Sequence, residues 1–431
     1  MRLELDIVNI KDVQFADKTT ISGGVLHINR RELEELLQED KRLSQVGIEL
    51  AHPGDKCRIL QVSDVVEPRA KTRESGEDFP SALGEPGTVG EGSTCVLRGS
   101  AVVTSDHSER GELSRDPNGD IIDMSGPAAE IGIYGKTHNV VVLPYPANGV
   151  SLEGYRIALK IAGLKTAVYL AKAGKALKPD EIEVYDLPPL TEIAKGLEGL
   201  SKVAYIFQVL STQYQPMLGD PVLYGSNIGG IVPTILHPNE VLDGAILRDY
   251  RAMGIETYVI QNHPIIKELY RRHGKELCFV GVIITLGYNN EPDYERAATV
   301  AANLAKRVLG ADGVVLTKSG GGVPEVAMAL AAQKCEELGV KTALAMCHFA
   351  ADVSDASFEG TMIFNLPEVN AIVSMGSPLE VITLPPMERI IGRPVASPEG
   401  LPVSGEIKRP LVWIKGTVGQ LGNLRLTSAR Y

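Results

Sequence analysis

Two blocks rich in histidine, carboxylate and amide side chains lie on either side of a short linking segment. The first block, residues 233–246, reads PTILHPNEVLDGAI, and the second, residues 261–276, reads QNHPIIKELYRRHGKE. If Pro238 begins a helix, His237 and Glu240 share one helical face. Such groups could perform general acid–base catalysis, although helix caps at a strand-to-helix junction use the same residue types.

We predict that the two histidines and the glutamate transfer protons, and that the amides and the aspartate bind substrate. The residues concerned are His237, Glu240 and His263 for the first role, and Asn239, Asp243 and Asn262 for the second. A metal site is not predicted, because three convergent ligands cannot be identified from this spacing.

Two further segments follow expected strands and could also reach a ligand. In the sequence TKSGGG, residues 317–322, the polar groups Lys318 and Ser319 and the backbone of Gly320 could bind a carboxylate or phosphate. A tight turn without a ligand explains the same glycines, and the pattern is no nucleotide fingerprint. Cys347 is a candidate thiol nucleophile, and a small buried cysteine is the alternative.

The second half of the chain alternates apolar strand-length runs with amphipathic helical segments. This alternation is typical of an open, mostly parallel α/β sheet with right-handed crossovers, in which ligands bind beyond the carboxyl ends of the strands. The expected strands are residues 204–210, 279–286, 313–317, 342–346 and 371–374, and the expected helices are residues 294–309 and 323–338.

The first half has the pattern of a mixed α+β domain with substantial antiparallel sheet. It contains short alternating strands and one long helical segment, residues 152–171. Residues 67–94 are rich in glycine, proline and charge, so we expect a long loop there, with the charged run 69–74 exposed to solvent. We therefore predict an α/β chain with a mixed α+β domain over residues 1–190 and a parallel-sheet domain over residues 200–431.

Composition narrows the classes of function. A net charge of −11 disfavours general nucleic-acid binding, which needs a basic surface, and the apolar runs are too short to span a membrane. Five cysteines without a CxxC pair are typical of reduced thiols in the cytoplasm. An iron–sulfur cluster on this chain is not expected, so any redox-active group must come from elsewhere.

The two blocks closely resemble those of the component B α/β proprotein of the glycine/sarcosine/betaine reductases, and the resemblance covers most of the chain. It implies a subunit of a substrate-specific reductase that works with a larger subunit carrying a selenocysteine or cysteine. Electrons would come from a thioredoxin-like donor, and the substrate would be a small molecule. Further matching segments are VLRG (96–99), IDMSGP (122–127), HGKEL (273–277), GADGV (310–314), VITLPPM (381–387) and QLG (420–422).

One departure from the family pattern affects the cofactor. The resemblance implies a precursor that cuts itself at a cysteine between the two blocks and leaves a pyruvoyl group. Here the link, residues 247–260, reads LRDYRAMGIETYVI and contains neither cysteine nor serine. Its one aliphatic hydroxyl, on Thr257, could not give pyruvoyl, so we predict an uncleaved chain without this or another cofactor. The alternatives are a non-catalytic scaffold subunit and, more weakly, a stand-alone hydrolase or lyase.

Overall fold

The largest sheet in the protein has six strands in the order β15-β16-β14-β17-β18-β19, and β15 alone is antiparallel to its neighbour. All nine residues of β16, which lies between β15 and β14, are buried, as its continuous apolar run requires. The strands are β14 (Lys202–Val209), β15 (Thr234–Leu236), β16 (Cys278–Leu286), β17 (Gly313–Thr317), β18 (Lys341–Met346) and β19 (Ala371–Ser374). The computed structural model describes residues 1–72, 76–108, 119–209, 219, 221–228, 231–248, 255–287, 292–318, 323–347, 369, 371–394 and 403–424.

Helices pack on this sheet as its crossover connections. The helix α7 runs against β16 and against α8, and a single π-helical segment, η2, extends its C-terminal end. Two short helices lie beside the link between the polar blocks: α4 ends before the link, and α5 begins within it. The bounds are α4 (Pro238–Leu242), α5 (Thr257–Gln261), α6 (Pro264–Arg272), α7 (Asp293–Asn303), η2 (Leu304–Val308) and α8 (Val323–Glu337).

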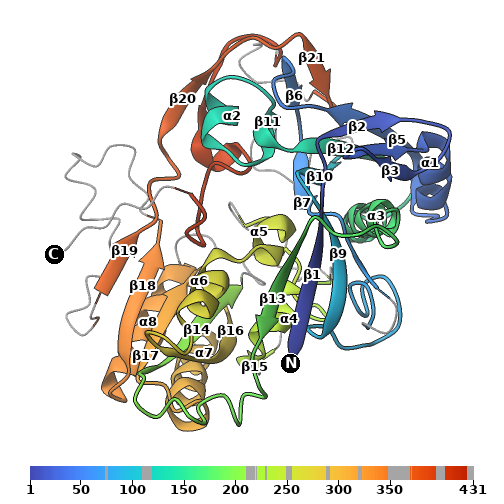
Figure 1. Cartoon of the computed structure of the whole chain (residues 1–431). Coiled ribbons are helices and arrows are strands. Elements are labelled where there is room, and N and C mark those ends of the chain that lie inside the picture. Colours follow the sequence, from blue (N-terminus) through green and yellow to red (C-terminus); the bar gives the residue numbers. More distant parts are fainter. Residues whose placement is uncertain are drawn as a thin grey trace.

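The N-terminal part contains two four-stranded sheets and a small three-stranded sheet, and it adds two strands to another three-stranded sheet, described below. The helix α3 packs against strands of both larger sheets (Figure 1). The first sheet consists of β13 (Glu181–Asp186), β1 (Arg2–Asn9), β9 (Gly92–Arg98) and β8 (Arg69–Lys71). The second consists of β5 (Leu43–Ala51), β12 (His138–Pro146), β10 (Ser100–Ser105) and β7 (Val62–Val66). The small sheet and helices are β2 (Asp12–Phe15), β4 (Val25–Ile28), β3 (Thr20–Ser22), α1 (Arg30–Gln38) and α3 (Leu152–Lys172).

After β19 the chain returns to the N-terminal part, along the red segment of Figure 1. There β21 pairs in parallel with β6, and the fully buried Arg58 on β6 forms an ion pair of 2.7 Å with Asp123. The guanidinium also donates to the carbonyl of Val403 at 2.6 Å, which fastens the returning segment. The elements here are β6 (Cys57–Ile59), β11 (Ile122–Asp123), α2 (Pro127–Ile131), η1 (Tyr134–Lys136), β20 (Val381–Leu384), β21 (Arg389–Ile391), β22 (Ile407–Pro410) and η3 (Leu411–Trp413).

The predicted fold class is confirmed, because the structure combines mixed and mostly parallel sheets with helices. The predicted elements of the second half fall within a few residues of β14, β16, α7, β17, α8, β18 and β19. The division into domains over residues 1–190 and 200–431 stays a prediction. The strand β21 from the second of these ranges pairs with β6 from the first.

The prediction of a long loop over residues 67–94 is wrong in part. Residues Arg69–Lys71 form the strand β8, and the side chains of both charged residues are about 4% exposed. Within the part of the chain that the structure describes, none of the helices is both long and apolar enough to span a membrane.

Candidate functional site

The first polar block opens α4 with a capping box. Pro238 occupies the first turn, the amide of His237 donates to Glu240 Oε2 at 2.6 Å, and the amide of Asn239 donates to His237 Nδ1 at 3.2 Å. The other oxygen of Glu240 accepts from the Tyr224 hydroxyl at 2.5 Å. The two predicted proton-transfer residues therefore do share one helix end, and both make helix-capping bonds there.

Electrostatics keep His237 neutral at ordinary pH. Its pKa is lowered to about 4, mainly by burial and also by the positive charge of the chain's N-terminus, although hydrogen bonds to the backbone of Pro188 and Leu187 oppose the shift. A neutral imidazole with a low pKa is a weak base, so its capping bond is the role that the geometry supports most directly.

Asn239 is fully buried and joins three parts of the chain. Its side-chain nitrogen lies within 3.0–3.2 Å of the carbonyl oxygens of Met1, Gly90 and Tyr185, and the Tyr270 hydroxyl donates to its side-chain oxygen. These contacts use its hydrogen-bonding capacity within the protein, and they hold α4 against the first N-terminal sheet.

Asp243, at the end of α4, forms a buried ion pair with Lys71 of β8. Its carboxylate also accepts from the amide of Gly90 at 2.6 Å and from the Thr94 hydroxyl at 2.8 Å. Only 5% of the lysine side chain and 1% of the aspartate side chain are exposed. A buried carboxylate with one cation and two neutral donors is well compensated for its loss of water.

Arg69, two residues before Lys71, binds both ends of the link. Its guanidinium donates to the carbonyl of Leu242 at 2.7 Å, to the carbonyl of Gln261 at 3.1 Å and to Asn262 Oδ1 at 3.2 Å. Glu67 balances its charge with hydrogen bonds of 2.9 and 2.5 Å to one oxygen. Five fixed donors in one plane allow arginine to make all these bonds at once.

The second block is held by the same strand region. The amide of Glu67 donates to Gln261 Oε1 at 2.9 Å, and Asn262 Nδ2 donates to Glu67 Oε2 at 2.9 Å. Lys267 of α6 adds a bond of 3.2 Å to Asn262 Oδ1. We call the buried group that joins the two blocks the clamp; its members are Glu67, Arg69, Lys71, Asp243, Gln261 and Asn262.

A small pocket lies beside the clamp. Besides Arg69, Lys71, Asp243 and Gln261 of the clamp, it is lined by Glu77, Asp78, Phe79 and Thr94. The two cations of the clamp already have partners, in Glu67 and Asp243 respectively, and the carboxyl groups of Glu77 and Asp78 also line the pocket. Burial raises the pKa of Asp78, although its Oδ1 accepts from the Lys71 amide at 2.6 Å and the positive charges of Lys175 and Lys172 oppose the shift. The pocket therefore offers carboxyl acceptors to a hydrogen-bond-donating group.

His263 lies next to Asn262 in sequence but points into the core of the large sheet. Its Nε2 is 3.1 Å from the Tyr205 hydroxyl, which also bonds Thr317, and its ring packs edge-on against Phe207. Complete burial lowers its pKa to about 3. The structure thus places His263 away from the clamp and keeps it neutral.

The remaining candidates lie at the carboxyl ends of β17 and β18. Lys318 is 1% exposed and forms an ion pair with Glu325 of α8, and burial lowers the pKa of this lysine although Glu325 opposes the shift. Burial raises the pKa of Cys347 to about 12, so very little thiolate exists at neutral pH. Ser319 and Gly320 lie outside the described residues.

At the link itself, the Thr257 hydroxyl is engaged in hydrogen bonds. It donates to Asp64 Oδ2 at 2.6 Å and accepts from the amide of Arg248 at 3.0 Å, and the amide of Thr257 donates to Asp64 Oδ1 at 3.0 Å. Asp64 therefore caps α5 from a distant strand, β7. The middle of the link, residues 249–254, lies outside the described residues.

Of the predicted site residues, the structure brings Asp243 and Asn262 together through one clamp. It separates them from the Lys318–Cys347 group and from His263. The clamp members that sequence reasoning missed are Glu67, Arg69, Lys71 and Gln261. The only available signal was the pair of cations spaced two apart around Ala70, which places both on one side of a strand.

The fold and the clamp define an α/β protein with a buried, charged site where the N-terminal sheets meet the large parallel sheet. Residues 1–408 match the family profile of glycine/sarcosine/betaine reductase component B subunits. The chain belongs to this family.

Three curated relatives illustrate the similarity. The chain is 36% identical, over the full length of both chains, to the glycine reductase complex component B subunits alpha and beta of Acetoanaerobium sticklandii. It is 37% identical to the sarcosine reductase complex component B subunit alpha of Peptoclostridium acidaminophilum, covering 91% of this chain and 89% of the relative. The betaine reductase subunit of the same organism is 31% identical, with 91% and 88% covered. No solved structure matches this chain significantly.

Proposed function

We propose that this chain is a subunit of a glycine/sarcosine/betaine reductase-like complex and that it binds a small substrate beside the clamp. The observation that carries the proposal is the small pocket next to Asp243, in which the carboxyl groups of Glu77 and Asp78 lie beside two balanced ion pairs. An amino group, which donates hydrogen bonds, suits these acceptors better than an anion does. The family relatives named above act in complexes of this kind.

In this proposal the chain binds and orients the substrate, and a larger partner subunit supplies the selenol or thiol that attacks the substrate carbon. The C–N bond is cleaved reductively, and the two electrons come ultimately from a thioredoxin-like donor. The five cysteines of this chain are all buried and unpaired, so none is suited to attack a substrate. A cytoplasmic location stays a prediction from the sequence.

The proposal also holds that the chain carries no pyruvoyl group. Pyruvoyl forms from cysteine or serine, and residues 247–260 contain neither. The hydroxyl of Thr257 is bonded to Asp64, which supports a capping role for it rather than a nucleophilic one. Without a carbonyl group to form an imine, the amine must be recognised by charge and hydrogen bonds alone, for which Asp78 and Asp243 are the nearest groups.

An intact mass of the protein from its native cells, measured under denaturing conditions, tests the missing pyruvoyl. A single species near 46.3 kDa supports an uncleaved chain. Two fragments that divide between residues 246 and 262 would refute it, and the smaller fragment would then be tested for a carbonyl with a hydrazine reagent.

Substrate binding is tested with the complex of this chain and its partner, assayed with a dithiol reductant and a panel of small amines. Asp78→Asn should raise KM with little change in kcat, because it removes charge that acts on bound substrate in the ground state. Glu85→Gln, at a carboxylate outside the pocket lining, is the control. Unchanged KM in Asp78→Asn would favour the second candidate, a scaffold that only supports the partner.

The buried candidates are less suitable for this test. His237 caps α4, and Lys318 neutralises Glu325, so their replacement would destabilise the fold and abolish turnover under either hypothesis. Their proposed roles in proton transfer and binding need variants that preserve folding, for example Lys318→Met combined with Glu325→Gln.

A further inference from the structure

A second group of polar side chains lies in the N-terminal part, outside the clamp. Among the described residues, Asp12, His52 and His138 form the group whose ligand atoms could hold one metal ion. Asp12 begins β2, His52 follows β5, and His138 begins β12. The antiparallel register pairs Ala51 with Asn139, so the next step along each strand brings the two histidines opposite one another.

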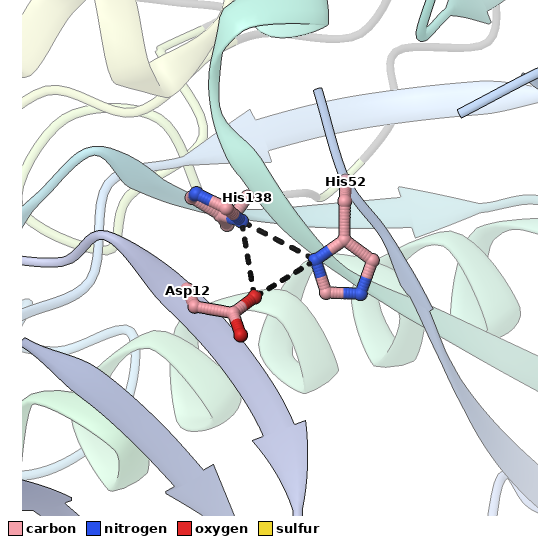
Figure 2. Close-up of side chains that lie close together, drawn as sticks. All are labelled: Asp12, His52 and His138. Atoms are coloured by element: carbon pink, nitrogen blue, oxygen red, sulfur yellow. Dashed lines mark hydrogen bonds and ion pairs between the residues drawn. The ribbon is translucent and has the colours of Figure 1, made fainter. Parts of the chain in front are cut away.

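The three ligand atoms face a common point (Figure 2). The Nδ1 atoms of His52 and His138 are 3.3 Å apart. Asp12 Oδ1 lies 3.2 Å from His52 Nδ1 and 3.7 Å from His138 Nδ1. In a tetrahedral zinc site with bonds of about 2.0–2.1 Å, neighbouring ligand atoms lie about 3.3–3.4 Å apart. Octahedral coordination at the same bond length would bring them to about 2.9 Å. The observed separations fit the tetrahedral arrangement better.

The close approach of the three ligand atoms also suits a cation. Neutral imidazole and ionised carboxylate are the forms that bind metals. A single proton between the two Nδ1 atoms makes a hydrogen bond between those two atoms only. A cation bound between the three side chains would contact all three ligand atoms.

The ligand residues are oriented by outer hydrogen bonds. Gln14 Nε2 donates to Asp12 Oδ2 at 2.7 Å, and the amide of Val13 donates at 2.9 Å to Oδ1, the oxygen that faces the histidines. The amide of His52 donates to Asp55 Oδ2 at 2.9 Å, and the amide of His138 donates to the carbonyl of Gly99 at 2.9 Å. The bond from Gln14 is the kind of outer partner that orients a ligand side chain in metal sites, and the two amide bonds fix the backbone at the histidines.

We propose that Asp12, His52 and His138 form a binding site for a divalent transition-metal ion, with zinc as the best match. The side chains are 35%, 33% and 17% exposed, respectively, so water reaches the site and supplies the fourth ligand. Two nitrogen ligands and one oxygen ligand suit zinc better than calcium or magnesium, which prefer oxygen alone. The ion would fasten the small sheet β2-β4-β3 to the β5–β12 edge. This site is independent of the reductase role and of the clamp.

The test uses the full chain, stripped with a chelator and titrated with Zn²⁺ in the presence of a competing chelator of known affinity. We expect one zinc per chain. His52→Gln and Asp12→Asn should each weaken zinc binding by more than about 100-fold, because losing only an outer partner costs about 10- to 100-fold. Gln14→Leu, which removes an outer partner, should fall in that smaller range. The control is His27→Gln on the adjacent strand β4, whose ring bonds Ser22 and is not one of the three ligands.

Cobalt substitution reports the geometry. Co²⁺ should give the intense visible absorption of a tetrahedral site, without a thiolate charge-transfer band, and circular dichroism should show that each variant is folded. The proposal is overturned if no stoichiometric zinc binds, or if affinity is unchanged in a folded Asp12→Asn/His52→Gln double variant. A weak octahedral cobalt spectrum, or zinc binding abolished by alkylating the cysteines, would also overturn it.

Discussion

The buried ion pair between Lys71 and Asp243 gives a quantitative test of the clamp. Lys71→Met keeps the length of the side chain and removes its charge. Asp243 would then retain only the Gly90 amide and the Thr94 hydroxyl as donors in a site where 1% of its side chain is exposed. Breaking one partner of a buried pair costs about 3–5 kcal/mol, because an uncompensated charge stays behind. We therefore expect Lys71→Met to lower the free energy of unfolding by about 3–5 kcal/mol.

Asp243→Asn should cost a similar amount, since it leaves the ammonium of Lys71 with the Glu91 carbonyl, 3.3 Å away, as its remaining acceptor there. The double variant Lys71→Met/Asp243→Asn carries neither charge, so we expect a loss of only about 1–2 kcal/mol, less than either single variant. The exposed pair Lys56–Glu388, with side chains 66% and 73% exposed, is the control, and its coupling should be below about 1 kcal/mol.

The assay is urea unfolding of the full chain, followed by circular dichroism and by the fluorescence of the single tryptophan, Trp413. Coincident transitions justify a two-state treatment, and an unchanged slope allows midpoints to be compared as free energies. If the two single losses simply add in the double variant, Lys71 and Asp243 do not compensate one another, and the account of the clamp given above is refuted.

Three further predictions follow from buried polar groups. Burial lowers the pKa of His107 to about 4, below its unfolded value near 6.5, so the unfolded chain takes up a proton first as the pH falls and stability is lost between pH 6.5 and 4. His107→Phe should therefore change unfolding little at pH 7 and recover about 2 kcal/mol near pH 4.5; an unchanged pH slope would contradict this. Arg58→Met should cost about 3–5 kcal/mol by leaving buried Asp123 unpaired, and limited proteolysis should then cut the returning segment beyond residue 385, whereas equal protease resistance would count against it. Thr257→Val should cost about 1–3 kcal/mol by removing the hydroxyl donor to Asp64, whereas Thr257→Ser should cost much less; equal losses would rule out the hydrogen bond as the cause.

Local patterns in the sequence predicted the large sheet well. The apolar run 279–286 lies in β16, because a continuous apolar run is a property of the segment itself. The helical segment 152–171 differs from α3 by one residue, but α3 is apolar and buried on most sides, so the expectation of an amphipathic helix there was wrong. The helix start at Pro238 was also predictable, since proline favours the first turn.

Prediction failed where burial depends on distant partners. Arg69 and Lys71 were expected in an exposed loop, because isolated charges are costly to bury. They lie in a buried strand because Glu67 and Asp243 neutralise them, and Asp243 is 172 residues away from Lys71. Similarly, Asn262 joins the clamp while neighbouring His263 packs in the core, a difference that the letters alone do not reveal.

The sequence by itself determined the fold class, the family and the absence of cysteine and serine from the link, because each is a property of residue types in order along the chain. Tertiary structure alone decided which charges meet. It brought β8 between the two polar blocks, and it set Asp12 against His52 and His138 across three strands. The physical reason is that a buried charge is stable only beside a compensating group, and such groups are chosen by packing, not by separation along the sequence.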